Sequence, residues 1–171
     1  MPTKDYLRPR LDLVFVGINP GLASERAGRH YAGPGNHFWP LLYESGIVPE
    51  PLTYREDERV LDHNIGMTNM VIRASRGLHE LTVDELREGA KALRAKLQRY
   101  RPKVVCFNGK RIFEIYAGRQ ASMGLQPHEP GEPLYFVMPS TSPRGASYQK
   151  ADKLVFFKEL KELLDRVRSE K

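Results

Sequence analysis

The sequence of 171 residues has little cysteine and no long hydrophobic run, and each absence excludes a class of protein. Its one cysteine, Cys106, excludes an internal disulfide framework and a cysteine-rich zinc module, and its apolar neighbours indicate a buried core thiol. No apolar stretch approaches the length of a transmembrane helix, and the first residues form no signal-peptide pattern. We therefore expect an intracellular protein without membrane contact, located in the cytoplasm or nucleoid of a bacterium or in the nucleus of a eukaryote.

The charge balance favours an anionic partner. The chain contains 27 Lys and Arg against 21 Asp and Glu, a formal net charge of +6. An excess of basic residues suits nucleic acid, although many intracellular proteins are mildly basic without binding it. The length and the hydrophobic fraction of 40% predict a single domain, residues 1–171, with a core of ordinary size.

Apolar segments alternate with helical patterns along the chain. Residues 13–16, 66–71, 104–107 and 134–138 predict four strands. Residues 82–85 have the spacing of a capping box and begin a helix that ends near residue 100. Further helices are predicted after Asn36, after residue 109 and from about Lys150, whereas residues 23–35 and 49–62 indicate loops, the second with a short helical piece. The alternation predicts an α/β fold of three layers, α/β/α, with a four-stranded, mainly parallel central sheet.

Polar side chains follow each of the four predicted strands. They are Asn19; Thr68 with Asn69; Asn108 with Lys110; and the serine-rich residues 140–144. Because the carboxyl ends of parallel strands meet at one edge, which is where open α/β sheets bind ligands, we expect these side chains to line a cleft.

Five motifs carry a family resemblance. They are Gly-Ile-Asn-Pro-Gly at 17–21, His-Tyr-Ala-Gly-Pro-Gly-Asn-His-Phe-Trp at 30–39, Gly-Met-Thr-Asn-Met-Val at 66–71, Asn-Gly-Lys at 108–110 and Met-Pro-Ser-Thr-Ser-Pro-Arg at 138–144. Together and in this order they resemble the mismatch-specific uracil and thymine DNA glycosylases of the uracil-DNA glycosylase superfamily, more closely the thymine-DNA glycosylase branch. The resemblance implies a uracil-DNA glycosylase type of fold.

The implied activity is that of a monofunctional DNA glycosylase that initiates base excision repair. Such an enzyme would act as a monomer, without a cofactor, on double-stranded DNA that contains a mismatched or damaged base. It would hydrolyse the N-glycosidic bond of uracil opposite guanine, and more weakly that of thymine or related damaged bases. A base inside a duplex cannot be attacked, so the nucleotide must first be flipped out, at least cost from a mismatch.

The resemblance assigns catalysis to Asn19, Thr68 and His30. Asn19 would position the attacking water, with help from Thr68, and His30 would lie near them. A carboxamide binds water but does not accept its proton near neutral pH, so catalysis would depend on positioning and charge stabilisation. A β-branched residue such as Thr68 is also common at a strand end, and an asparagine is common in turns.

The base pocket implied by the resemblance consists of Ile18, Tyr31 and Asn36. The Tyr31 ring would stack on the flipped base, and backbone groups of Ile18 would contact its edge. A loop tyrosine also serves as simple packing, and Asn36 also suits a helix cap.

The DNA backbone would be held by Ser140, Ser142 and Lys110, and Arg144 would enter the gap left by the flipped nucleotide. A serine-rich turn and a solvated lysine are the ordinary alternatives. The spacing of a P-loop is missing around Lys110, and the five histidines show no metal-ligand spacing, so no metal is expected.

Two positions depart from the family pattern: Ala32 replaces a proline, and Pro143 replaces a small residue before Arg144. We expect a G:U mismatch to be a better substrate than G:T, because the thymine methyl must fit beside Ala23 and Tyr31. Two other functions suit the same scaffold. One is a non-catalytic module that binds DNA or nucleotides. The other is a phosphate-ester hydrolase, but this sequence has no paired carboxylates after its predicted strands that would hold the metal of such an enzyme.

Overall fold

The computed structural model describes residues 3–143 and 148–170. The elements in chain order are β1 (Leu13–Gly17), α1 (Leu22–Ala27), α2 (Phe38–Glu44), the 3₁₀ helix η1 (Tyr54–His63), β2 (Ile65–Asn69), η2 (Leu78–Glu80), α3 (Val83–Tyr100), β3 (Val104–Asn108), α4 (Lys110–Ala117), β4 (Gly124–Leu125), β5 (Leu134–Met138) and α5 (Lys150–Ser169).

The strands form one five-stranded sheet in the order β2-β1-β3-β5-β4. The four predicted strands pair in parallel, and β4 pairs antiparallel with β5. The predicted α/β class and mainly parallel sheet are confirmed, but the count of four strands is wrong by one. The two-residue β4 was missed because so short a segment carries no alternation of apolar and polar residues.

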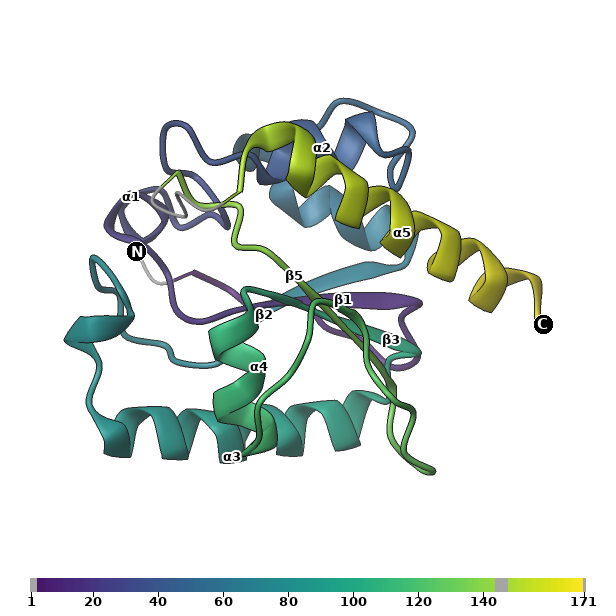
Figure 1. Ribbon diagram of the computed structural model, residues 1–171. Coiled ribbons are helices and arrows are strands. Elements are labelled where there is room, and N and C mark those ends of the chain that lie inside the picture. The colour runs from purple at the N-terminus through teal and green to yellow at the C-terminus, as the bar shows by residue number, and fades with distance from the viewer. Residues whose placement is uncertain (1–2, 144–147, 171) are drawn as a thin grey trace.

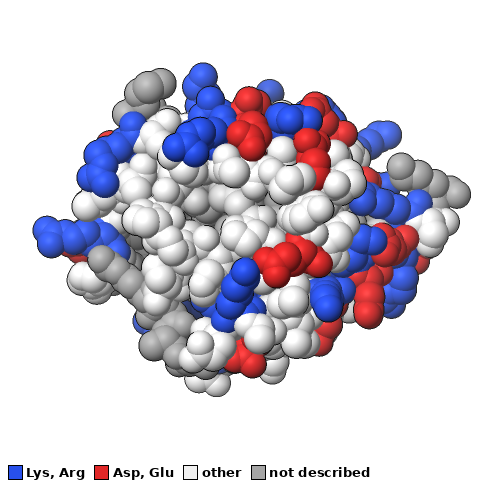
Figure 2. Space-filling model, turned by 90° about the horizontal axis from the view of Figure 1, so that it is seen from above, with Lys and Arg blue, Asp and Glu red and all other residues white. Residues whose placement is uncertain are grey.

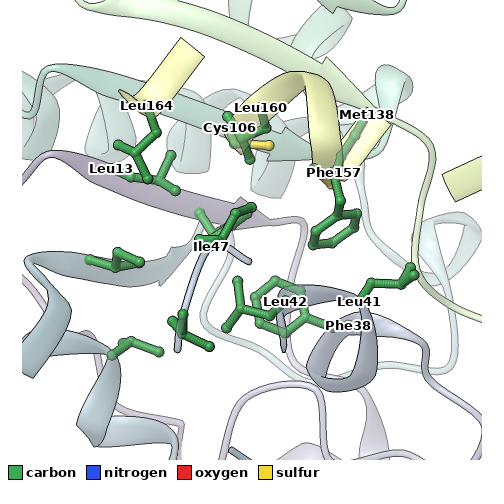
Figure 3. Close-up of a cluster of buried hydrophobic side chains, with 14 of the residues drawn as sticks. Leu13, Phe38, Leu41, Leu42, Ile47, Cys106, Met138, Phe157, Leu160 and Leu164 are labelled. Carbon is green, nitrogen blue, oxygen red and sulfur yellow. The ribbon is translucent and has the colours of Figure 1, made fainter. Parts of the chain in front are cut away.

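Helices cover both faces of the sheet, so the three layers are confirmed. Figure 1 shows α2 and α5 above the sheet and α3 and α4 below it. Successive strand side chains point to opposite faces. Thus Leu13 and Phe15 pack with α2 and α5 in the cluster drawn in Figure 3, whereas Val14 and Val16 pack with α3 and α4.

A local sequence signal fixes the start of the long helix α3. The Thr82 side chain accepts a hydrogen bond from the Glu85 amide and the Glu85 carboxylate accepts one from the Thr82 amide, so the predicted capping box of α3 is confirmed. The expectation of a loop over residues 23–35 is wrong at its start, where α1 forms. This helix has six residues, and Gly28 after it adopts the left-handed conformation that ends a helix. A helix of this length is too short to show a helical period in the sequence.

None of the described helices combines the length and apolar composition needed to cross a membrane.

Candidate active site at the carboxyl edge of the sheet

The side chain of Asn19 is held in one orientation beside the end of β1. Its Nδ2 donates hydrogen bonds to the carbonyl oxygen of Arg73 at 2.7 Å and to Oγ of Ser75 at 2.8 Å. Within the described residues its Oδ1 accepts no hydrogen bond. The carboxamide oxygen of a half-buried side chain is therefore left to accept one from a ligand or a water molecule.

The segment that holds Asn19 continues from β2 and runs alongside the residues after β1. The amides of Met70 and Val71 donate to the carbonyls of Gly17 and Ile18, and the Ser75 amide donates to the carbonyl of Pro20. The Arg73 guanidinium in turn pairs with Glu85 of α3, with Nε 2.6 Å from the carboxylate. This network fixes the backbone on both sides of Asn19.

A side chain at Gly17, the last residue of β1, would crowd two polar groups that lie over it. A Cβ on Gly17 would lie 2.5 Å from Oδ1 of Asn69 and 3.3 Å from Oη of Tyr31. Gly17 and Asn69 are paired in the register of β1 and β2, so their substituents point to the same sheet face. The end of the sheet thus presents the side chains of Asn69 and Tyr31 together on the α2 side.

Tyr31 is held in a strained backbone conformation with a packed ring. Its φ is 52°, in the left-handed region that non-glycine residues seldom occupy, at a cost of order 1 kcal/mol. Its ring stacks on Phe38 of α2, with ring centroids 4.2 Å apart and an interplanar angle of 19°. Burial raises the pKa of the Tyr31 phenol, and a hydrogen bond with Asn108 opposes that effect in part. The phenol is therefore neutral near pH 7.

Asn108 joins the loop after β3 to the loop after β5. Its Nδ2 donates to Oγ1 of Thr141 and its Oδ1 accepts from the Thr141 amide, both at 2.9 Å. The Thr141 carbonyl accepts from the amide of His37, at the start of α2. The predicted phosphate-binding turn is therefore attached to the loop that carries Tyr31 and Asn36.

Three of the four predicted DNA-contacting residues lie in this turn or at the start of α4. Oγ of Ser140 accepts a hydrogen bond from the Ser142 amide, and the Ser140 Cβ lies 4.0 Å from the position of a Cβ on Gly109. Lys110, the first residue of α4, is exposed and forms no ion pair with any described residue. Arg144 lies outside the described residues. The structure thus brings Ser140, Ser142 and the start of α4 together.

Asn36 precedes the N-cap residue of α2, which is His37, so the prediction of Asn36 as the cap is wrong by one position. The Oδ1 of Asn36 still accepts a hydrogen bond from the amide of Phe38, the first residue of α2. This bond uses the carboxamide oxygen and leaves the amino group to donate. The carbonyl oxygen of Ile18 accepts from the Val71 amide, and the Ile18 amide donates no backbone hydrogen bond within the described residues, so its predicted contact with a base edge stays a prediction.

Thr68 and His30 have surroundings typical of structural residues. Thr68 is buried, and its hydroxyl donates to Asp5 at 2.7 Å and accepts from Lys96 of α3 at 3.4 Å. In the register it pairs with Val16, which faces α3 and α4, so Thr68 points away from the face that carries Tyr31. No hydrogen bond joins it to Asn19 in the part of the chain that the structure describes.

His30, the residue before Tyr31 in the same loop, is buried. Its amide donates to Asp57 at 2.8 Å, its carbonyl accepts from the Trp39 indole, and Nε2 lies within hydrogen-bond distance of the Lys4 carbonyl. An N–H at Nε2 is required to bond a carbonyl, and burial lowers the pKa of the imidazole, so the ring is neutral near pH 7. Catalytic roles for Thr68 and His30 stay predictions.

Comparisons with known proteins identify the family and the type of fold. The model of the uracil DNA glycosylase superfamily matches residues 4–165. The chain belongs to the uracil DNA glycosylase superfamily. The solution structure of a candidate uracil DNA glycosylase from Methanosarcina acetivorans superposes with a TM-score of 0.59 at 19% identity, covering 94% of this chain and 97% of that chain. This likeness confirms the predicted type of fold.

Members of this superfamily act on DNA, and the margin of the molecule near the site is basic. Figure 2 shows mostly Lys and Arg along its left side, the side on which α1 lies in Figure 1, whereas basic and acidic side chains alternate on the right. Exposed cations on this side suit a phosphate backbone.

A separate open cavity of about 750 Å³ lies at the opposite edge of the sheet. It is lined by the ends of α3 and α5 and by Leu134 at the start of β5. Its Arg94 is already paired with Glu132, at 3.4 Å. No set of three metal-ligating side chains gathers within residues 3–143 and 148–170. We therefore place the candidate site at the carboxyl edge, where the polar side chains of the five motifs gather.

Sequence reasoning missed one participant in this site, Ser75. It is 4% exposed and contacts Asn19, yet it lies outside the five motifs. A serine in a loop carries no local signal of such a contact. Its role depends on the segment after β2 lying against the segment after β1.

Proposed function

We propose that the protein is a monofunctional DNA glycosylase that removes uracil opposite guanine from duplex DNA, and more weakly thymine or related damaged bases. The observation that carries this proposal is the fixed orientation of Asn19, whose amino group is occupied by Arg73 and Ser75 and whose oxygen is left for a ligand. Membership of the uracil DNA glycosylase superfamily supports the class of reaction.

In the proposed reaction, Oδ1 of Asn19 accepts a hydrogen bond from a water molecule below the sugar. The water oxygen forms a bond to C1′ while the bond from C1′ to N1 of the base breaks, and the base leaves with the electron pair. The carboxamide does not take the water's proton, because it is not basic near pH 7. That proton is released to solvent, and the departing base takes up a proton from solvent. The rate gain therefore comes from holding the water in line and from stabilising the separating charges.

The groups around Gly17 are proposed to receive the flipped base. The Tyr31 ring offers a flat face that accepts several pyrimidines, and Asn69 and Asn36 offer carboxamides for hydrogen bonds with its polar edge. Because the position of Tyr31 is fixed by its stack on Phe38, the pocket needs little reorganisation when the base enters.

The duplex is proposed to lie across the loops after β3 and β5. Ser140, Ser142 and Lys110 would bind phosphates beside the lesion, and Arg144 would occupy the vacated position in the stack. Phosphate contacts displace counterions, so DNA affinity should fall steeply as salt concentration rises. Pro143 packs 3.6 Å from the position of a Cβ on Gly35, which favours a stiff turn before Arg144.

The test uses a duplex with one deoxyuridine opposite guanine, followed by hot alkali and a denaturing gel. The wild-type protein should produce an alkali-sensitive site, and Asn19→Ala should slow single-turnover cleavage by about 10²- to 10³-fold while leaving DNA affinity nearly unchanged. Asn64→Gly is the matched control, because it removes a carboxamide at the other end of β2 and tolerates the left-handed conformation there. Arg144→Ala should weaken binding of the flipped state.

The non-catalytic alternative makes the opposite prediction. A DNA-binding module would bind the mismatch tightly, leave the strand resistant to alkali and behave identically with and without the Asn19 side chain. A parallel series of G:U and G:T duplexes tests the base preference, for which we expect faster cleavage of G:U. Equal single-turnover rates would contradict that preference.

A further inference from the structure

The loop after β2 contains a buried hydroxyl that contacts the side chain proposed to hold the water. Ser75 is 4% exposed, and its Oγ accepts a hydrogen bond from Nδ2 of Asn19 at 2.8 Å. The same Oγ donates to the carbonyl oxygen of Gly77 at 3.0 Å. The Ser75 amide donates to the carbonyl of Pro20, the residue that follows Asn19.

The polarity of these bonds determines which end of the Asn19 carboxamide faces the cleft. A hydroxyl has one hydrogen, and that of Ser75 is directed to the Gly77 carbonyl, so its Oγ is left to act as an acceptor. The second partner of Asn19, the Arg73 carbonyl, is an acceptor by nature. Two acceptors on one side favour the amino group there and disfavour the flipped carboxamide, whose oxygen would face two oxygens.

We propose that Ser75 is a positioning residue that sets the orientation of the Asn19 carboxamide for catalysis. This inference rests on the proposed glycosylase function. Without the Ser75 hydroxyl, one of the two acceptors is lost, and the carboxamide rotates and flips more readily. The water would then be held correctly for a smaller fraction of the time. The cost should fall on the chemical step rather than on DNA binding, because Ser75 is buried and does not reach the DNA.

The test compares two isosteric variants, Ser75→Thr and Ser75→Val, together with Ser75→Ala. Single-turnover cleavage of the G:U duplex is measured with enzyme in excess, and DNA affinity is measured by fluorescence anisotropy on the same duplex carrying a non-cleavable 2′-fluoro-deoxyuridine. We expect Ser75→Ala and Ser75→Val to slow cleavage roughly 10- to 100-fold with affinity within about twofold, because small misplacements of a reacting group are costly. Ser75→Thr keeps the hydroxyl and should retain most of the rate.

A double variant separates positioning from a general loss of structure. In the Asn19→Ala background, Ser75→Ala should have almost no further effect, because the group that it orients is gone. Equal slowing in both backgrounds would overturn the inference, and so would wild-type cleavage by Ser75→Val. Thermal unfolding of each variant shows whether the Thr and Val proteins are equally folded, which keeps this comparison valid if Ser75→Ala is unstable.

The same panel distinguishes failure of this inference from failure of the proposed function. If the wild-type protein cleaves and Asn19→Ala does not, whereas the Ser75 variants are normal, only the positioning role is wrong. If the wild-type protein does not release the base, the glycosylase proposal is wrong and the role of Ser75 is overturned with it.

Discussion

Asn69 lies across Gly17, with its Oδ1 only 2.5 Å from the place that a Cβ would occupy. Gly17→Ala must therefore displace the Asn69 side chain and crowd the Tyr31 hydroxyl. We expect at least a roughly tenfold loss in single-turnover cleavage of a G:U duplex with DNA affinity largely kept, because the pocket is altered and not the DNA-binding turn. Gly33→Ala is the control, since a Cβ there meets no atom within 4 Å. Equal rates for the two variants would contradict this picture of the pocket.

Thr68→Val should affect stability more than catalysis. The Thr68 hydroxyl bonds the Asp5 carboxylate, and its loss should lower the free energy of unfolding by about 1.5–3 kcal/mol, the usual worth of a hydrogen bond to a charged group. Asp5→Asn provides the partner variant and should destabilise in the same direction. Chemical denaturation measures the stability and single-turnover assays the rate. A rate as low as that of Asn19→Ala, with stability unchanged, would instead establish a catalytic role for Thr68.

His30 should make the protein sensitive to mild acid. Burial lowers the pKa of its imidazole below the usual value near 6.5, so below that pH the unfolded chain binds a proton that the native state resists. The free energy of unfolding therefore falls as the pH drops below about 6.5, by at most about 1.4 kcal/mol per pH unit for this group. The pKa of His37 is shifted in the same direction, by burial and by Lys153, and adds to the effect.

His30→Gln tests this assignment, because glutamine keeps a donor for the Lys4 carbonyl but does not titrate. Its stability should depend less on pH between about 5 and 6.5. The control is His79→Gln at an exposed position. A pH dependence identical to that of the wild-type protein would show that His30 is not the responsible group.

Lys153 should make the free energy of unfolding rise with pH in the alkaline range. It is 1% exposed, and its Nζ lies 3.3 Å from both His37 Nδ1 and the Ser142 carbonyl. Burial lowers the pKa of its amine from the usual value near 10.5, so in the window below 10.5 the unfolded chain holds more protons and stability rises with pH. Lys153→Met should remove that rise, measured by urea denaturation at several pH values, whereas Lys158→Met at an exposed position of α5 should keep it.

Much of the fold was predictable because its signals are local. The capping box at Thr82 and the four apolar strands appear as expected, since a side-chain cap and a continuous apolar run depend on neighbouring residues. The short α1 and β4 were not predicted, because six and two residues carry too little pattern. Of the two roles considered for Asn36, a hydrogen bond to the start of α2 could be predicted from neighbouring residues, whereas a contact with a base could not.

The residues of the candidate site also divide into those that local motifs indicate and those that only tertiary contacts bring together. Sequence motifs singled out Asn19 and Tyr31, but not the contact of Asn19 with Ser75, 56 positions later in the chain. Sequence also grouped Thr68 with Asn19, whereas the register turns Thr68 towards Asp5 and Lys96 and turns its neighbour Asn69 towards Tyr31.

By itself, the sequence determined the alternation of strands and helices, predicted the carboxyl edge as the place of the candidate site, and contained the five motifs that resemble the superfamily. Only the tertiary structure decided which side chains share a face, which end of the Asn19 carboxamide is left open, and which polar residues serve the core. The physical reason is that consecutive strand residues point to opposite sides, and that hydrogen bonds between distant loops depend on packing that no local pattern records.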